Sequence, residues 1–376
     1  MGAPSDEARR RDPIRILFCC GPSYFTHLAA AIASLLASNQ DEQLEIHLAT
    51  SLPDLAQEAR LARWVEGRGA KLKLHRFDWG ATRWHTSFHI TQEAYIRLFA
   101  PRFLDSTIGK ALYLDADLLV LGNLRPLWEI DLTGFAVAAS PDPYGQSRRQ
   151  ALGIGLDVPY VNSGVLLMNL DLWREHDLSG RLCAYVEEAG ERLLFHDQDA
   201  LNAVLAGQIL PLDYRWNLQA KMLRRRARRR LPEAAAIARA VRAPAILHYT
   251  SARKPWLFVM ATPAKSLYWR YLRQTPWAAT RSPDLRWAKA PEFALNHLLD
   301  LAGLDYTWDR VRRATLPGRA LDHLLSFLAR LTGRAAATGR SSNDRAREGD
   351  ASEPRGAAAR QRPGAGPPDP NLELRS

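Results

Sequence analysis

The chain has 376 residues, of which 47% are hydrophobic, and this is typical of a globular protein that buries a large core. Its formal net charge of +11 indicates an anionic partner, such as a phosphorylated substrate, an anionic lipid or a nucleic acid. Three cysteines are too few for a disulfide framework, no apolar run is long enough to span a bilayer, and the N-terminus lacks a secretory signal. We therefore expect a cytoplasmic protein, at most peripheral on the cytoplasmic face of the membrane.

Short apolar runs alternate with amphipathic segments in the first hundred residues. We predict strands at 14–20, 44–50 and 71–77 and helices at 27–37, 55–67 and 91–100. Thr91 is the expected cap of the last helix. Strand–helix alternation predicts an α/β fold with parallel strands. Ligands of such sheets bind beyond the carboxyl ends of the strands, so the loop after Cys20 is a candidate site.

The stretch 110–128 places two aspartates within apolar sequence. Apolar residues 111–114 lead to Asp115 and Asp117, and a second apolar run follows at 118–121. The pattern predicts a buried parallel strand, in which an unpaired carboxylate is very costly. Residues two apart in an extended chain face the same side, so both aspartates can bind one divalent cation. The alternative for any Asp-x-Asp pair is a solvated turn.

The second half of the chain continues the α/β pattern. We predict strands at 135–140, 161–170 and 245–249 and helices at 172–189 and 200–206. Asn162, Ser163 and Gly164 lie near the start of the second of these strands. Small polar residues at such a place usually form a turn. The functional alternative is that Gly164 lets a ligand approach the backbone.

His248 lies near the end of the last predicted strand, and Lys254 follows six residues later. A single histidine there is more often a core or surface residue than a ligand. Two aspartates and one histidine nevertheless form a mixed oxygen and nitrogen set that suits Mn²⁺ or Mg²⁺, with positions left for phosphate oxygens. Lys254 would then meet a diphosphate leaving group as negative charge develops on it.

Five segments in chain order carry a resemblance to a known family: YLDADLLVLGNLRPLW, YVNSGVLLMNLDLW, FHDQDALN, YRWN and LHYTSARKPW. The chain resembles the family 8 retaining glycosyltransferases, which include bacterial lipopolysaccharide galactosyl- and glucosyltransferases. The resemblance implies a GT-A fold, with a Rossmann-like, mostly parallel sheet flanked by helices. It also implies Mn²⁺-dependent transfer of galactose or glucose from a UDP-sugar, with retention, to a lipopolysaccharide-type or membrane-associated glycan acceptor.

The resemblance assigns roles to individual residues. It implies that the metal ligands are Asp115, Asp117 and His248. It implies that the donor-binding residues are Tyr24, Arg97, Asn162, Ser163 and Lys254. The catalytic positions beside the transferred sugar are Asp197 and Gln198, with Gln198 nearest the anomeric carbon. An amide is a poor nucleophile, so we expect front-face attack rather than a covalent intermediate on Asp197 or Asp199, with the departing UDP oxygen taking the acceptor proton.

Two departures from the family pattern concern the nucleotide and its phosphates. The family commonly has an acidic residue after the first strand that helps to hold uracil or ribose. This chain instead has Cys20-Gly21-Pro22-Ser23-Tyr24. Of the family's pattern in this loop, only the aromatic residue is kept, as Tyr24. The family's glycine three residues after the histidine is Ser251 here. The sequence therefore leaves nucleotide discrimination open.

Two basic segments lie outside these motifs. The run 221–230 carries seven basic residues in ten, which fits a solvated face or a surface for an anionic glycan, a membrane or, least favoured, nucleic acid. Leucines within 316–331 fall on one helical face with arginines around it. That pattern fits either a helix packed on the domain or one lying on an anionic membrane.

These observations divide the chain into four parts. We predict a flexible N-terminus (1–13), a catalytic domain (14–280), a basic and partly amphipathic helical extension (281–334) and a disordered tail (335–376). Two rival functions remain open. One is a soluble transferase for a capsular or storage glycan, and the other is a catalytically inactive membrane- or nucleic-acid-binding protein with the same fold.

Overall fold

The computed structural model describes residues 12–294, apart from 81, 83, 87–90, 251, 287–288 and 290–292. The chain divides into two units at Thr315, and the described residues all belong to the first, Met1–Thr315. The predicted tail, nearly all of the predicted basic extension and most of the predicted N-terminus lie outside the described residues. No helix in the described part of the chain combines the length and the apolar character that a membrane span requires.

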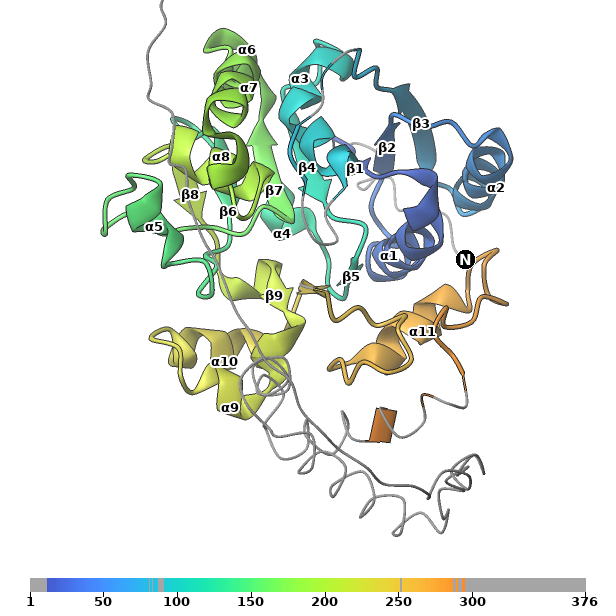
Figure 1. Ribbon diagram of the computed structural model, residues 1–376. Helices are drawn as coiled ribbons and strands as arrows, with labels where there is room; N and C mark the ends of the chain where they lie inside the picture. Colours follow the sequence, from blue (N-terminus) through green and yellow to red (C-terminus); the bar gives the residue numbers. More distant parts are fainter. Residues whose placement is uncertain are drawn as a thin grey trace, which may run out of the picture. The chain divides into compact units, whose positions relative to one another are not determined.

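A seven-stranded sheet forms the centre of the first unit (Figure 1). Its strands, in spatial order, are β3 (Lys71–Arg76), β2 (Leu44–Thr50), β1 (Ile14–Cys19), β4 (Lys110–Leu114), β7 (Val165–Asn169), β6 (Val137–Ala139) and β8 (Ile209–Pro211). Neighbouring strands are parallel, except that β7 is antiparallel to both β4 and β6. The predicted mostly parallel sheet is confirmed. Hydrophobic periodicity does not report strand direction, so the reversal of β7 was not predicted.

The described part of the chain also contains helical elements. They are α1 (Phe25–Ser38), α2 (Leu55–Glu66), α3 (Ala100–Phe103), α4 (Arg125–Trp128), α5 (Arg148–Ala151), α6 (Leu170–Glu175), α7 (Leu178–Ala189), α8 (Asp197–Val204), α9 (Arg225–Arg228), α10 (Ala234–Arg242) and α11 (Lys265–Leu272), with 3₁₀ turns η2 (Pro22–Tyr24), η3 (Gln92–Phe99), η4 (Gly190–Arg192), η5 (Tyr214–Trp216) and η6 (Ala220–Leu223). Alternate residues of β1 enter two different cores, as a strand buried on both faces requires. Ile16 and Phe18 share one core with α1, whereas Leu17 and Cys19 share the other with η3.

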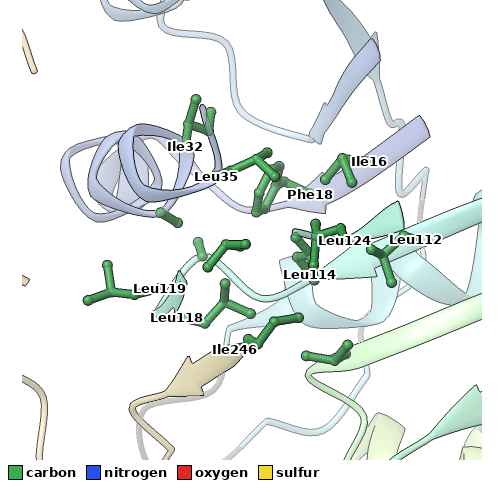
Figure 2. Close-up of a cluster of buried hydrophobic side chains, with 14 of the residues drawn as sticks. Ile16, Phe18, Ile32, Leu35, Leu112, Leu114, Leu118, Leu119, Leu124 and Ile246 are labelled. Carbon is green, nitrogen blue, oxygen red and sulfur yellow. The ribbon is translucent and has the colours of Figure 1, made fainter. Parts of the chain in front are cut away.

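A second, three-stranded sheet contains β5 (Leu118–Val120), β10 (Ile246–His248) and β9 (Leu218–Gln219). Figure 2 shows apolar side chains of β1, β4 and α1 gathered with those of β5 and β10. Burial of each such side chain contributes roughly 1.5–3 kcal/mol, so this core holds the two sheets together. The chain passes from one sheet to the other between Leu114 and Leu118.

The structure corrects the prediction that the two aspartates lie within one extended strand. β4 ends at Leu114, and residues 115–117 form a turn before β5 begins in the other sheet. Because the turn lies at the carboxyl end of β4, both carboxylates still reach one site. The apolar runs on either side are buried as predicted, but in different sheets.

Three predicted helices differ from the observed ones. Residues 91–100 form the 3₁₀ element η3 followed by α3, and Thr91 precedes η3 without a side-chain cap hydrogen bond. Most of η3 is buried, so tertiary contacts outweigh helical propensity there. The helix predicted at 172–189 is two helices, because Asp177 has a φ of 41° and caps α7 by accepting from the Gly180 N–H. The helix predicted at 200–206 begins earlier, at Asp197.

Candidate active site

A cavity of about 720 Å³ opens beyond the carboxyl ends of β1 and β4. Its wall includes the whole predicted set of metal, donor and catalytic residues: Tyr24, Arg97, Asp115, Asp117, Asn162, Ser163, Asp197, Gln198, His248 and Lys254. These residues come from segments up to about 230 positions apart, and the fold brings all of them together. The position agrees with the rule that open α/β sheets bind ligands at this edge.

Asp115, Asp117 and His248 form a compact group of three donors. One ligand atom of each lies within 4.8 Å of the others. The His248 Nε2 atom is 3.1 Å from an Asp117 oxygen and 3.4 Å from an Asp115 oxygen. Two carboxylate oxygens and one imidazole nitrogen, with cavity space beside them, are a donor set that fits a divalent cation.

Charge pairing holds these groups in place. The Lys254 ammonium bonds the second Asp117 oxygen, and the Arg97 guanidinium lies 3.1 Å from Asp115. Burial opposes ionisation of Asp117, yet Lys254 and His248 hold the pKa of its carboxyl well below the usual range. Burial likewise lowers the pKa of the His248 imidazole, but Asp117 and Asp115 outweigh it and raise this pKa to about 9. The group therefore carries paired charges that a cation and a diphosphate can rearrange.

Gly164 makes room for the side chains of Asp115 and His248, which together with Asp117 are the candidate metal-ligand group. A Cβ atom there would lie 2.1 Å from the His248 Cε1 atom and 2.6 Å from the Asp115 Oδ2 atom. Real Cβ atoms do not approach other atoms so closely, so any larger residue would displace the two side chains. The sequence suggested that Gly164 admits a ligand to the backbone. The structure shows that it admits the side chains of Asp115 and His248.

A hydrogen-bond network fixes Gln198 in another part of the cavity wall. Its side-chain oxygen accepts from the Asn162 amide at 2.9 Å and from the Ser163 N–H at 3.2 Å. Its side-chain nitrogen donates to Asp142 and to the Tyr160 hydroxyl, each at 3.2 Å. Gln198 thus uses both ends of its amide and keeps one orientation.

Asp197 and Asp199 lie in different surroundings. Asp197 lines the cavity, 3.3 Å from the Arg97 Nε atom, and accepts from the Ser163 hydroxyl. Burial raises the pKa of its carboxyl to about 6 although Arg97 lowers it. Asp199 is fully buried, pairs with Arg148 at 2.9 Å and does not line the cavity. Of the two acids considered as nucleophiles from the sequence, only Asp197 faces the site.

The backbone immediately before Asp197 is in an unusual conformation. His196 has a φ of 50° and a ψ of −119°, and its side chain is completely buried. A non-glycine residue in such a region costs about 1–3 kcal/mol and persists only where the surroundings enforce it. The conformation aims the first turn of α8, with Asp197 and Gln198, at the cavity.

Tyr24 belongs to an aromatic cluster beside Lys254. Trp256 stacks on the His27 ring at a centroid distance of 3.5 Å and meets Tyr24 edge-on at 5.9 Å. The Tyr268 hydroxyl lies 2.7 Å from the His27 Nδ1 atom. The cluster therefore joins α1 and α11 to the loop that carries Lys254.

The sequence analysis gave no role to several residues of the cavity or its support. Asn217 accepts from the His248 ring at 3.0 Å and donates to Asn162 at 2.8 Å, so it links the two walls. Asp142 accepts from Gln198 and Gln219. The YRWN segment ends at Asn217, so this motif could have indicated a role for Asn217. Asp142 and Gln219 carried no sequence pattern that marked them.

The basic run 221–230 is not simply a solvated face. Lys221 lines the cavity, with its ammonium 3.1 Å from the centre of the Tyr144 ring. Arg224 donates to the Ala261 carbonyl and Arg228 to the Met222 carbonyl. Part of the run therefore supports the fold, and one of its members faces the site.

Solved structures with this fold define the class of protein. The galactosyltransferase LgtC, in complex with donor and acceptor sugar analogues, matches with a TM-score of 0.64 and 24% identity over 74% of this chain and 100% of its own. An active-site mutant of LgtC matches with a TM-score of 0.63 and 25% identity, over 70% of this chain and 96% of that one. The fold is therefore that of the GT-A glycosyltransferases, and the predicted fold class is confirmed.

The chain belongs to glycosyl transferase family 8, whose model matches residues 15–259. General stress protein A of Bacillus subtilis is 29% identical over 286 residues, which are 74% of this chain and 99% of that protein. Lipopolysaccharide 1,2-glucosyltransferase of Escherichia coli is 22% identical, over 70% and 79% of the two chains. The match covers 62% of GlyF of Streptococcus pneumoniae, at 28% identity. The protein is a glycosyltransferase that uses a nucleotide-sugar donor and a glycan acceptor, and GT-A enzymes generally use a divalent metal.

Proposed function

We propose that this protein transfers galactose or glucose from a UDP-sugar, with retention and with Mn²⁺ as its metal, to a lipopolysaccharide-type or other membrane-associated glycan. The observation that supports the proposal is one cavity whose wall contains Asp115, Asp117, His248 and Lys254 together with Gln198. Mg²⁺ is the alternative metal, because both ions accept oxygen ligands.

The proposed metal ligands are Asp115, Asp117 and His248. A bound divalent cation supplies a positive charge at the diphosphate and so stabilises the leaving group. The proposed role of Lys254, which bonds Asp117 in the structure, is to neutralise a phosphate oxygen in the same region. Arg97 forms ion pairs with both Asp115 and Asp197 and so fixes the two carboxylates relative to each other. Its guanidinium also donates to the Ser163 carbonyl at 2.8 Å.

The proposed role of Gln198 is to orient the transferred sugar beside the diphosphate. An amide held at both ends does not act as a nucleophile, which supports attack by the acceptor hydroxyl on the face that UDP leaves. The proton of that hydroxyl then passes to the departing phosphate oxygen. Asp197 directly precedes Gln198 in the sequence, and its side chain lines the cavity. A glycosyl adduct trapped on Asp197 would therefore contradict this mechanism.

The first test is a screen of UDP-sugars for Mn²⁺-dependent hydrolysis. We expect turnover with UDP-galactose or UDP-glucose, and its loss on chelation of the metal. Comparison of transfer rates with lipid-linked and with soluble glycan acceptors separates the membrane-associated function from synthesis of a capsular or storage glycan. If calorimetry detected no binding of UDP in the presence of Mn²⁺, the catalytically inactive alternative would be favoured.

The acceptor class is supported by one similarity and by charge. Among the relatives, a lipopolysaccharide 1,2-glucosyltransferase shares 22% identity over 70% of this chain.

The proposed catalytic domain is 14–280, and we propose that the basic segment 281–334 contributes affinity for an anionic membrane. Sedimentation with anionic vesicles, with and without residues 281–376, tests this. Equal sedimentation of both forms would exclude a membrane role for the segment.

A further inference from the structure

One arm of the cavity has no role in the proposed function so far. The metal-ligand group and Lys254 meet the diphosphate, and Gln198 meets the sugar. This part of the wall follows β1 and includes Cys20, Gly21, Pro22, Ser23 and Tyr24, together with Leu52, Thr91 and Glu93. If the donor is a nucleoside diphosphate sugar, its nucleoside occupies this arm. The inference that follows rests on the proposed function in this respect.

Gly21 is not required by the backbone. Its φ of −81° and ψ of 168° are extended values that any residue adopts. A Cβ atom added there would lie 3.4 Å from the Glu93 Oε1 atom and 3.5 Å from the Glu93 Cδ atom. The space beside Gly21 is therefore occupied by a carboxylate that comes from η3 rather than from the end of β1.

Glu93 is a buried acid that lines the cavity. It is 9% exposed, and its Oε1 atom accepts from the Ser51 hydroxyl at 3.2 Å. Over the described ranges, neither Lys nor Arg forms an ion pair with it. It lies four residues before Arg97, which is tied to Asp115 and Asp197. A buried carboxylate without a cation is costly unless it accepts further hydrogen bonds, so its chemistry suits a ligand that donates N–H or O–H.

We propose that Glu93 recognises the nucleoside of the donor, as a carboxylate supplied by η3 in place of the acidic residue that is absent after β1. A carboxylate only accepts hydrogen bonds. It therefore suits the ring N–H of uracil or the hydroxyls of ribose, and it disfavours cytosine, which presents an acceptor at the corresponding ring nitrogen. Glu93 is a specificity-determining residue for the nucleotide. A Cβ atom at Gly21 would only touch Glu93, whereas a longer side chain there would enter the space that the carboxylate occupies.

The test measures binding of nucleotides rather than turnover. Calorimetry in the presence of Mn²⁺ gives the Kd of UDP, CDP and 2′-deoxy-UDP for the full-length protein and for Glu93→Gln. We expect the unaltered protein to prefer UDP by about tenfold or more over CDP, if the base is read, or over 2′-deoxy-UDP, if ribose is read. Glu93→Gln keeps the shape but adds a donor, so that preference falls to about threefold or less. Ser51→Ala, which leaves the carboxylate in place, is the matched control and retains the preference.

Moving the carboxylate from position 93 to position 21 tests whether it recognises the nucleotide or only supports the fold. Glu93→Ala lowers the affinity for UDP by about tenfold, and Gly21→Asp combined with Glu93→Ala restores most of it, because the new carboxylate reaches the same space from β1. The proposal is overturned if the unaltered protein binds UDP but shows neither preference, or if Glu93→Gln binds UDP and keeps the preference that the unaltered protein shows. It is also overturned if the double variant binds UDP no better than Glu93→Ala. Absence of UDP binding by the unaltered protein in the presence of Mn²⁺ would instead remove the proposed function, and this inference with it.

Discussion

The two walls of the cavity are built on different principles. The wall around Asp115, Asp117 and His248 consists of charged groups that pair with one another and with Lys254. The wall around Gln198 contains amides and hydroxyls together with the carboxylates of Asp142 and Asp197, and the Gln198 amide is hydrogen-bonded at both ends within the protein. Charged partners can be exchanged when a cation and a diphosphate arrive, whereas a satisfied amide network holds one geometry. The first wall can therefore rearrange, whereas the second stays preorganised.

Two residues couple the walls. Arg97 bonds Asp115 on one side and Asp197 on the other, and Asn217 bonds His248 and Asn162. Variants that break a single wall, or only the link between the walls, therefore have separable effects on metal affinity and on turnover.

The largest effect is expected from Asp117→Ala. It removes a proposed metal ligand and the partner of Lys254, so metal-dependent transfer should be abolished while the fold remains intact. Mn²⁺-dependent hydrolysis of the donor and a thermal unfolding curve measure the two properties. Asp41→Ala, at an exposed position, serves as the control. Full activity of Asp117→Ala would refute the metal-site assignment.

Gly164→Ala should break the charged wall by steric displacement. The added methyl group meets His248 and Asp115, so we expect weaker Mn²⁺ binding by about tenfold or more and a loss of roughly 1–3 kcal/mol of stability. Titration with Mn²⁺ and denaturant unfolding measure these effects. Unchanged values in both would show that the metal-ligand group does not need the space that glycine leaves.

Asn217 links the two walls through its contacts with His248 and Asn162, and the variants Asn217→Ala and Asn217→Asp distinguish the effects of these two contacts. Loss of a residue that orients a metal-binding histidine typically lowers metal affinity about 10–100-fold, and we expect this for Asn217→Ala. Asn217→Asp keeps an acceptor for His248 but loses the donor to Asn162, so Mn²⁺ affinity should change less than turnover. If both variants lowered Mn²⁺ affinity equally, the contact with Asn162 would be the important one.

The smallest effect on function is expected from Tyr160→Phe. It removes a hydroxyl that donates to Asp199 at 2.6 Å and accepts from Gln198. A buried group left without its partner costs about 1–3 kcal/mol, so stability should fall while Mn²⁺ affinity stays the same. A change in Mn²⁺ affinity equal to that of Asn217→Ala would show that the walls are not separate.

The candidate site was predictable to the extent that its chemistry is local. Asp115 and Asp117 stood out because carboxylates interrupt apolar sequence, and the resemblance added His248, Gln198 and the donor-binding positions. The cavity contains all of them. Their roles remain proposals that the variants above test.

The sequence alone predicted most of the strands, the mostly parallel sheet and the sheet edge at which the candidate site lies, because apolar periodicity and turn residues act over a few neighbouring positions. It did not predict the short strands β8 and β9. The tertiary structure alone decided which strand is reversed, that the two aspartates lie in a turn between sheets, and that Glu93 occupies the space beside Gly21. It also decided that Asn217 joins the two walls. Each of these facts depends on contacts between residues far apart in the chain, and no local pattern records which distant side chains will meet.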